Sequence, residues 1–264
     1  MDVVARERRS TPLASTCTAP HTCPRPLRLD VLSHAPYFAG LSREEIIALD
    51  EAAKVRGYTE GEAIYHAGGS AEHLFLLASG RVKVLRPALD DSDVLVEVIT
   101  PGATFGSVAA LGHSTYPDTA MALTVSCVLR ISAADLRRVM NRHPAVALAV
   151  LDEVSHRLEE AQQTVRRLSG GTVEQRVASS LLVLADQLGE PRDGGVLLQL
   201  PLTREDLASM TGTTTESVSR TLSKWRRAGL IETGRRWTSL TDRAALAAIA
   251  GAAHGPGPVR ARRG

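Results

Sequence analysis

Glu216, Ser219 and Arg220 are polar side chains whose types and spacing suit the recognition of base pairs. Residues three and four apart share one face of a helix, so all three can point the same way. A glutamate accepts a hydrogen bond from the N4 amino group of cytosine, and an arginine pairs with O6 and N7 of guanine. The spacing therefore predicts a helix that reads base edges in the major groove of DNA.

Two short helices joined by a glycine turn would present these side chains. Thr203-x-x-Asp206 is a capping box that predicts a helix over 204–210. Gly212 supplies the tight turn, and a second helix is expected from 215 to about 228. Opposite its polar face, the second helix has a stripe of apolar residues that we expect to be buried: Val218, Leu222 and Trp225. This agreement favours DNA reading over the alternative that the charges only solvate an exposed helix.

Hydroxyl groups and cations around these helices are expected to contact phosphates. The segment that begins at Gly229 predicts a two-stranded wing with Arg235 and Arg236 at its tip. Between Arg204 and Arg243 there are eight Lys and Arg residues against five Asp and Glu, so the region is basic although the whole chain has a net charge of only +2. The predicted phosphate contacts are Thr203, Arg204, Thr213, Thr214, Thr215, Lys224, Arg235 and Arg236.

A long helix that begins at Pro144 is predicted upstream of this region. Its apolar residues recur at alternating intervals of three and four, which is the pattern of a coiled-coil seam. The seam residues are Leu151, Val154, Leu158, Ala161, Val165 and Leu168. We expect the seam to pair two copies of the chain, the alternative being a helix packed on its own domain. Gly170-Gly171 is expected to end the helix and to form a hinge.

Residues 55–131 alternate short apolar runs with glycine-containing turns, which is typical of an antiparallel barrel or jelly roll. A helix over 42–53, opened by a Ser42-x-x-Glu45 capping box, precedes them. The predicted fold class is therefore α+β. We divide the chain into a mobile arm over 1–28, a jelly-roll sensor domain over 29–143, a dimerisation helix and hinge over 144–170, a winged helix-turn-helix over 171–250, and a disordered basic tail over 251–264.

The composition, with 44% hydrophobic and 23% charged residues, is ordinary for a globular protein. No apolar run reaches the ~18–20 residues that span a bilayer, and the arginines near the N-terminus precede no apolar segment of a secretory signal. We therefore expect a cytoplasmic protein without membrane contact. The absence of a nucleophile elbow, a Walker loop, zinc-ligand spacing and a dinucleotide fingerprint argues against an enzyme.

Several segments together resemble the CRP/FNR superfamily of bacterial regulators. They are Leu202-Thr-Arg-Glu-Asp-Leu-Ala, Gly212, Thr215-Glu-Ser-Val-Ser-Arg220 and Gly229-Leu-Ile in the C-terminal half, and Gly61-Glu62 with Gly68, Leu74 to Gly80-Arg-Val-Lys-Val, and Pro101-Gly102 with Gly106 in the jelly roll. The glutamate-serine-arginine pattern implies a homodimer that reads an FNR-like palindrome of TTGA half-sites on double-stranded DNA. Such a dimer would recruit or block RNA polymerase.

The jelly roll departs from the family members that bind cyclic AMP. Those members hold the nucleotide with a Gly-Glu pair and an Arg-Ser/Thr pair. Here Gly106 is followed by Ser107, and the later position reads Pro117-Asp118-Thr119. The missing arginine removes charge-assisted bonds to phosphate, and an aspartate adds repulsion. We therefore expect no tight binding of cyclic AMP.

The cysteines Cys17, Cys23 and Cys127 resemble in part the iron–sulfur ligands of FNR-type members. Ala14 stands where that pattern needs a further cysteine, and Leu129 stands at the barrel ligand position. A thiol switch, another metal site or haem are the alternatives, and Cys127 also suits a small core residue. We expect a redox, oxygen or nitric-oxide-related signal. The other functions left open are a response to an unidentified small molecule, or a cyclic-nucleotide-binding scaffold without a gene-regulatory role.

Overall fold

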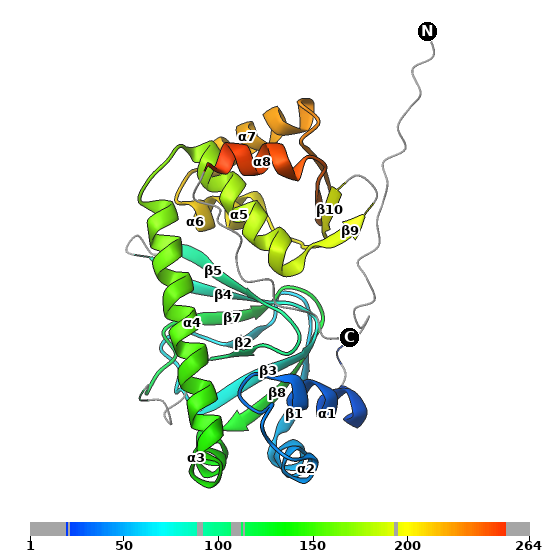
Figure 1. Ribbon diagram of the computed structural model, residues 1–264, viewed down its shortest axis with the longest axis vertical. Coiled ribbons are helices and arrows are strands. Elements are labelled where there is room, and N and C mark those ends of the chain that lie inside the picture. The colour runs from blue at the N-terminus through cyan, green and yellow to red at the C-terminus, as the bar shows by residue number, and fades with distance from the viewer. Residues whose placement is uncertain are drawn as a thin grey trace. The chain divides into compact units, whose positions relative to one another are not determined.

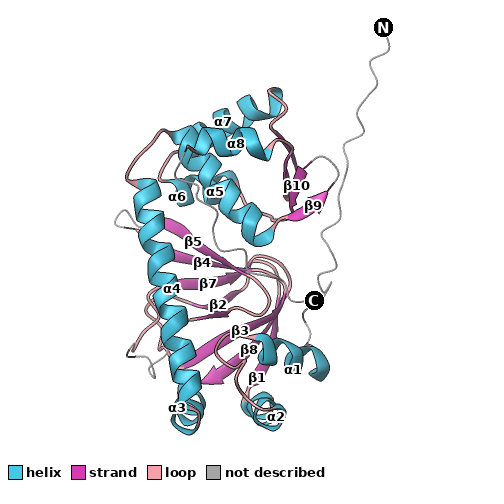
Figure 2. Ribbon diagram, viewed as in Figure 1, coloured by secondary structure: helices cyan, strands magenta, loops and turns pink. Residues whose placement is uncertain are grey.

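The computed structural model has two compact units, one that runs to residue 162 and one that begins at residue 163 (Figure 1). Both combine helices with strands, which confirms the predicted α+β class (Figure 2). The described residues are 20, 22–88, 92–106, 112, 114–192 and 195–251. Cys17, with most of the predicted arm, and the predicted tail after Gly251 lie outside them.

Two four-stranded antiparallel sheets make up the described β-structure of the N-terminal unit. One sheet has the strand order β1-β8-β3-β6 and the other β2-β7-β4-β5 (Figure 1). The strands are β1 (Lys54–Tyr58), β2 (Ala63–Tyr65), β3 (His73–Ser79), β4 (Val82–Pro87), β5 (Asp93–Ile99), β6 (Thr104–Phe105), β7 (Thr119–Ala122) and β8 (Ser126–Ser132). The predicted antiparallel β domain is confirmed. β1 and β6 escape prediction because each contains or adjoins a glycine that indicates a turn.

Aromatic rings fill the core that joins the two sheets. The ring centroids of Tyr65 and Tyr116 are 4.0 Å apart, and Tyr65 also stacks on Phe75 at 5.2 Å. Phe75 in turn stacks on Phe105 at 5.3 Å, and all four side chains are buried. The Tyr65 hydroxyl donates to the Asp118 carboxylate at 2.8 Å. Burial, and next the Asp118 charge, raise the pKa of Tyr65, so this phenol remains a neutral hydrogen-bond donor.

A second core lies on the other face of the sheet that contains β3 and β8. Leu74 and Leu76 of β3 point into it, whereas Phe75 and Leu77 point into the aromatic core, as the alternation of a strand requires. Two helices cover this second core (Figure 1): α1 (Arg25–His34) and α2 (Arg43–Ala52). α2 begins with the predicted Ser42 capping box.

The prediction of a mobile arm over 1–28 is wrong for its last residues. Cys23 is fully buried in the second core, and α1 begins at Arg25. Arg28 donates two hydrogen bonds of 2.6 and 2.8 Å to the buried Asp50 carboxylate of α2. The prolines that suggest disorder here stand before and inside the first turn of α1, where a missing backbone N–H costs nothing.

The predicted long helix is α4 (Pro144–Leu168), which follows α3 (Ala133–Arg142). Val146 and Val150, near its start, are buried in the second core. The helix ends before Gly170, as predicted. None of the described helices combines the length and apolarity that crossing a bilayer requires.

Arg157 attaches the middle of α4 to the jelly roll. Its guanidinium donates to the backbone oxygen of Thr104 in β6 and, at 3.2 Å, to Glu153 one turn back. Burial raises the pKa of the Glu97 carboxyl on β5, and the Arg157 charge opposes this shift. α4 is therefore linked to the β-structure by polar contacts as well as by the two valines.

The C-terminal unit is built around α5 (Val173–Leu188), whose buried face includes Val177, Leu181 and Leu184. The other elements are β9 (Glu190–Arg192), β10 (Gly195–Leu198), α6 (Arg204–Thr211), α7 (Thr215–Arg227), β11 (Ile231–Gly234), β12 (Trp237–Leu240) and α8 (Arg243–Ala250). A loop is expected where β9 lies. β9 is an edge strand of the sheet β11-β12-β10-β9, a position that tolerates Pro191.

Candidate nucleic-acid interface

The helix-turn-helix has the caps and the turn that its sequence predicts. The Thr203 hydroxyl accepts from the Asp206 amide at 3.0 Å, and the Asp206 carboxylate accepts from the Thr203 amide at 2.8 Å. Gly212 ends α6 in the left-handed conformation with φ of 57°. Thr214 is the N-cap residue of α7, and its side chain accepts a backbone N–H of the first turn at 3.2 Å.

Arg176 on α5, a partly buried side chain, holds this turn. Its Nε donates to the carbonyl of Thr211 at 2.8 Å, and its Nη2 to that of Gly212 at 3.3 Å. A third bond of 3.0 Å goes to the carbonyl of Gly171. Sequence reasoning misses Arg176 because its partners in the turn lie 35 and 36 residues away and no local motif marks them.

The two faces of α7 are as predicted. The apolar stripe is buried, with exposed fractions of 0–1%: Val218, Leu222 and Trp225. Opposite this stripe, the Glu216 and Arg220 side chains are 78% and 72% exposed, and Ser219 is partly buried. Glu216 and Arg220 form an ion pair at 3.7 Å. Such an exposed pair contributes little, so exchanging it for contacts with bases costs little.

The predicted phosphate contacts differ in how available they are. Thr215 is exposed at the start of α7. Lys224 lies at the other end, where its ammonium group is 2.7 Å from the Glu174 carboxylate of α5. Arg204 is partly buried, and burial, with a smaller contribution from the Arg226 charge, lowers its pKa. Lys224 is therefore paired with Glu174 in this structure, and exchanging this largely exposed pair for a phosphate costs little.

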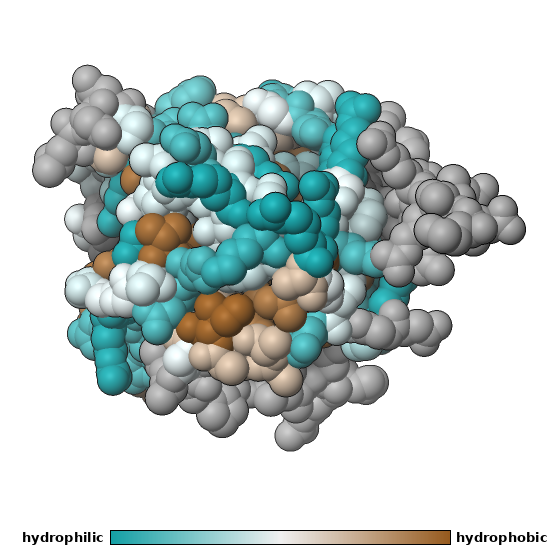
Figure 3. All heavy atoms as spheres, turned by 90° about the horizontal axis from the view of Figure 1, so that it is seen from above, coloured by the Kyte–Doolittle hydropathy of each residue, from teal (hydrophilic) through white to brown (hydrophobic). Residues whose placement is uncertain are grey.

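The predicted wing is a hairpin of β11 and β12. Gly234 pairs with Trp237, which leaves Arg235 and Arg236 as its two-residue loop. Arg235 is exposed, and Arg236 has a φ of 70°, a conformation that side chains with a Cβ rarely adopt. Figure 3 looks down on α7 and α8, and hydrophilic side chains are prominent in this view beside smaller apolar patches. The wing tip thus carries two arginines on a short, constrained loop.

The predicted seam on α4 is exposed in the single chain. The exposed fractions of its leucines and valines range from 39% to 64%: Leu151, Val154, Leu158, Val165 and Leu168. Ala161 is exposed with them. Leu148, three residues before Leu151, is 63% exposed and extends this apolar row. The predicted seam does not include it. This row is too long to be a chance group of surface residues.

Cys23 and Cys127 lie together in the second core, whereas Cys17 falls outside the described residues. Beside them are the hydroxyl of Ser79 and the guanidinium of Arg28, neither of which is an iron ligand. The described part of the chain holds no group of three or more His, Cys, Asp or Glu side chains able to hold a metal ion. The donors described here therefore do not fit a four-iron cluster.

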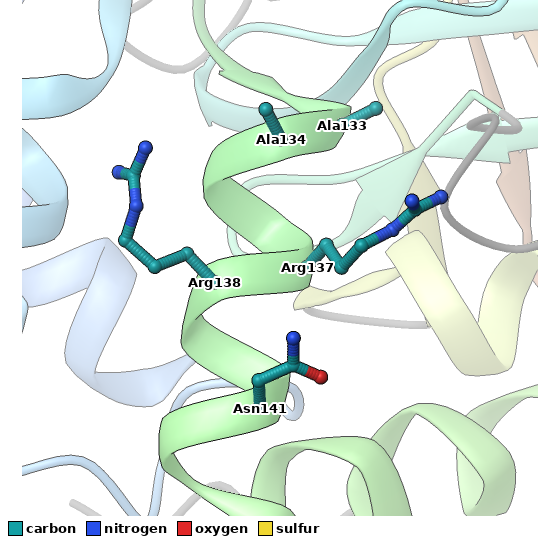
Figure 4. Close-up of a pocket in the computed structure, with 5 residues that line it drawn as sticks. All are labelled: Ala133, Ala134, Arg137, Arg138 and Asn141. Atoms are coloured by element: carbon teal, nitrogen blue, oxygen red, sulfur yellow. The ribbon is translucent and has the colours of Figure 1, made fainter.

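Two hollows in the structure lack the features of a small-molecule site. A hollow of about 430 Å³ beside α3 is lined by Ala133, Ala134, Arg137, Arg138 and Asn141 (Figure 4). The two guanidinium groups point to opposite sides of α3, and Arg138 is paired with Asp135 at 2.5 Å. A second hollow, of about 230 Å³, lies in the winged unit among leucines and wing residues. Neither converges polar groups on one point, as ligand recognition requires.

Comparison with known proteins matches both halves of the chain. Residues 55–143 match the cyclic nucleotide-binding domain, and residues 175–249 match the Crp-like helix-turn-helix domain. The cyclic AMP receptor protein of Thermus thermophilus is 30% identical over 217 residues, which is 82% of this chain and 97% of that protein. The transcriptional activator FnrA of Stutzerimonas stutzeri is 24% identical over 81% of this chain and 87% of its own length.

Solved structures give the same assignment. A transcriptional regulator of the CRP family from Thermus thermophilus has a TM-score of 0.64 at 30% identity, covering 74% of this chain and 96% of its own. FixK2 from Bradyrhizobium japonicum has a TM-score of 0.68 at 25% identity, covering 76% and 99%. These similarities agree with the jelly roll, the long helix and the winged helix-turn-helix described above. The chain belongs to the CRP/FNR family of transcription regulators.

Proposed function

We propose that this regulator reads a palindrome of TTGA half-sites on double-stranded DNA. The observation that carries the proposal is that Glu216 and Arg220 project from the exposed face of α7, opposite a fully buried stripe. Arg220 would pair with the guanine of each half-site, and Glu216 would accept from a cytosine amino group. Ser219, between them, is short enough to let the helix approach the base edges.

A homodimer on the α4 seam would supply the two-fold symmetry that a palindrome requires. The seam has the alternating spacing of a parallel coiled coil, and its side chains are exposed in one chain. Burying each leucine against a second copy contributes roughly 1.5–3 kcal/mol. Bound at a promoter, the dimer would recruit or block RNA polymerase in the cytoplasm.

Binding to a short duplex tests the proposed operator. A gel-shift titration should show that the dimer prefers a TTGA palindrome to one in which the guanine of each half-site is replaced. Each mismatched base pair costs about 1–3 kcal/mol, so two of them should weaken binding by roughly 30-fold or more. Equal affinity for the two duplexes would overturn the proposed specificity, and sedimentation of the complex would report one dimer per palindrome.

We also propose that the signal is related to redox state, oxygen or nitric oxide and not to cyclic AMP. The aromatic stack occupies the interior between the sheets, and Asp118 would present a negative charge to a phosphate. Asp118 is partly buried and accepts a hydrogen bond from Tyr65, which holds its carboxylate beside the aromatic core.

Calorimetry with cyclic AMP should therefore give no saturable heat at nucleotide concentrations up to about 1 mM. This result would mean that the binding free energy is weaker than about 4 kcal/mol. The Thermus thermophilus relative that is named a cyclic AMP receptor protein, titrated in the same buffer, is the positive control. A micromolar dissociation constant for this chain would contradict the prediction and would make cyclic AMP a candidate signal.

A further inference from the structure

Two cysteines that are 104 residues apart meet in the second core. The backbone N–H of Cys23 donates to the Cys127 sulfur at 3.1 Å, and the Cys23 sulfur lies 3.5 Å from the Ser79 hydroxyl. Ser79 is the partner of Cys127 in the β3–β8 ladder, so these two side chains leave the sheet on the same face. Cys23 is 0% exposed and Cys127 is 1% exposed.

This arrangement brings the two sulfur atoms within reach of each other. A cysteine sulfur lies about 3–4 Å from its own amide nitrogen, so the two sulfurs are at most about 7 Å apart. Rotation about χ1 of both side chains, with a small shift of the Cys23 backbone, can close this gap to the S–S bond length of about 2 Å. Cys23 precedes α1 and belongs to no strand or helix, so no ladder or helix hydrogen bond opposes that shift, which has to break only its contacts with Cys127 and Arg28.

A cation stands beside the pair. Arg28 donates from Nη1 to the carbonyl of Cys23 at 2.9 Å while it binds Asp50. Hydrogen bonding to Asp50 is the main reason that the pKa of Arg28 is raised, and the charges of Cys127 and Cys23 add to the effect. Arg28 therefore fixes the backbone of Cys23 beside α2.

We propose that Cys23 and Cys127 form a redox-active pair whose oxidation to a disulfide ties the segment before α1 to the β-structure. One thiolate attacks a hydroperoxide, the O–O bond breaks, and a sulfenic acid forms while an alcohol leaves. The second thiolate then attacks that sulfur, the S–S bond forms, and the hydroxide leaves as water. Two electrons and two protons pass from the thiols to the peroxide.

The bond would act on the helix that carries the dimer seam. Cys23, Cys127, Val146 and Val150 belong to one cluster of buried residues, so the start of α4 packs in the same core as the sulfur pair. A bond that draws Cys23 onto β8 changes the packing around those valines. This step rests on the redox signal of the proposed function, and it assigns that signal to two named residues.

Peptide mapping of the full chain tests the disulfide directly. Reduced protein is treated with hydrogen peroxide under native conditions, alkylated, and digested without reduction. We expect a cross-linked peptide that joins Cys23 to Cys127, and a thermal midpoint roughly 5–10 °C above that of the reduced protein. The Cys17→Ser variant should give the same peptide and the same shift, whereas Cys23→Ala and Cys127→Ala should give neither.

Other linkages would overturn the proposal, and operator binding separates it from the proposed function. A Cys17–Cys23 peptide, a bond between two chains, or a Cys23 that stays reduced would each contradict it. If the cross-link forms and reduced and oxidised proteins bind a TTGA palindrome equally, the disulfide stands and the redox signal fails. If neither form prefers the palindrome, the operator assignment fails while the peptide map still decides the disulfide.

Discussion

Replacing Arg220 by alanine is expected to weaken operator binding by roughly 30-fold to 10⁴-fold. The variant removes one bidentate pair with guanine in each half-site, and each pair discriminates by about 1–3 kcal/mol. Folding should not change, because the side chain is 72% exposed and its pairing with Glu216 is an exposed ion pair. A gel-shift titration of wild type and variant on the same palindrome measures the loss.

The charge of Arg220 can be separated from its geometry. Arg220→Lys keeps the positive charge but cannot form the planar two-bond contact, so it should lose most of the preference for guanine. Arg227→Ala removes an exposed arginine of the same helix that lies outside the predicted base-reading set. It should weaken all duplexes alike and leave the preference intact. An Arg220→Ala protein that still prefers the guanine-containing palindrome by the wild-type ratio would show that another residue reads that base.

Replacing Leu158 by glutamate is expected to convert the dimer to monomers and to abolish operator binding at concentrations where the wild type is bound. Leu158 lies in the middle of the seam and is 59% exposed in the single chain. In a two-fold dimer the change removes two buried leucines, worth about 3–6 kcal/mol together, and places two carboxylates in an apolar interface. Sedimentation equilibrium would measure the dimer dissociation constant, which should increase by roughly 10²-fold or more.

The same charge placed off the seam is the control. Gln163→Glu adds a carboxylate to an exposed position of α4 on the side away from the seam, so the protein should remain dimeric. Circular dichroism should give the same helix content for both variants, because neither side chain is buried in the single chain. If Leu158→Glu remains dimeric, the seam is not the interface and α4 pairs through another face.

The parts of the interface that could be predicted are those with local rules. These parts depend on residues at most a few positions apart: the Thr203–Asp206 capping box, the Gly212 turn and the apolar stripe of α7 that includes Val218. Spacing alone determines which side chains of α7 face the core. The seam on α4 is predictable for the same reason. In each case the spacing of apolar residues along a helix, together with a residue that marks where the helix begins or ends, is sufficient for the prediction.

The parts that could not be predicted depend on contacts between distant segments. Only the resemblance to iron–sulfur ligands groups Cys23 with Cys127; no local rule predicts that the two lie in contact, and the prolines around Cys23 suggest disorder instead. The ion pair between Lys224 of α7 and Glu174 of α5 joins residues that are 50 positions apart, so no local pattern predicts it. The aromatic stack arises from rings on different strands that only strand pairing brings together.

Two of the three hydrogen bonds of Arg176 limit how far α6 and α7 can move relative to α5. They fasten the carbonyls of Thr211 and Gly212 to α5, so the turn between α6 and α7 has no independent joint. We therefore expect α5, α6 and α7 to move together, and any adjustment of a recognition helix to be made on the N-terminal side of α5. The backbone there offers Gly170 and Gly171, the latter at a φ of 79°. The turn is thus fixed to α5, and we expect the chain to pivot at Gly170 and Gly171, of which Gly171 is itself hydrogen-bonded to Arg176.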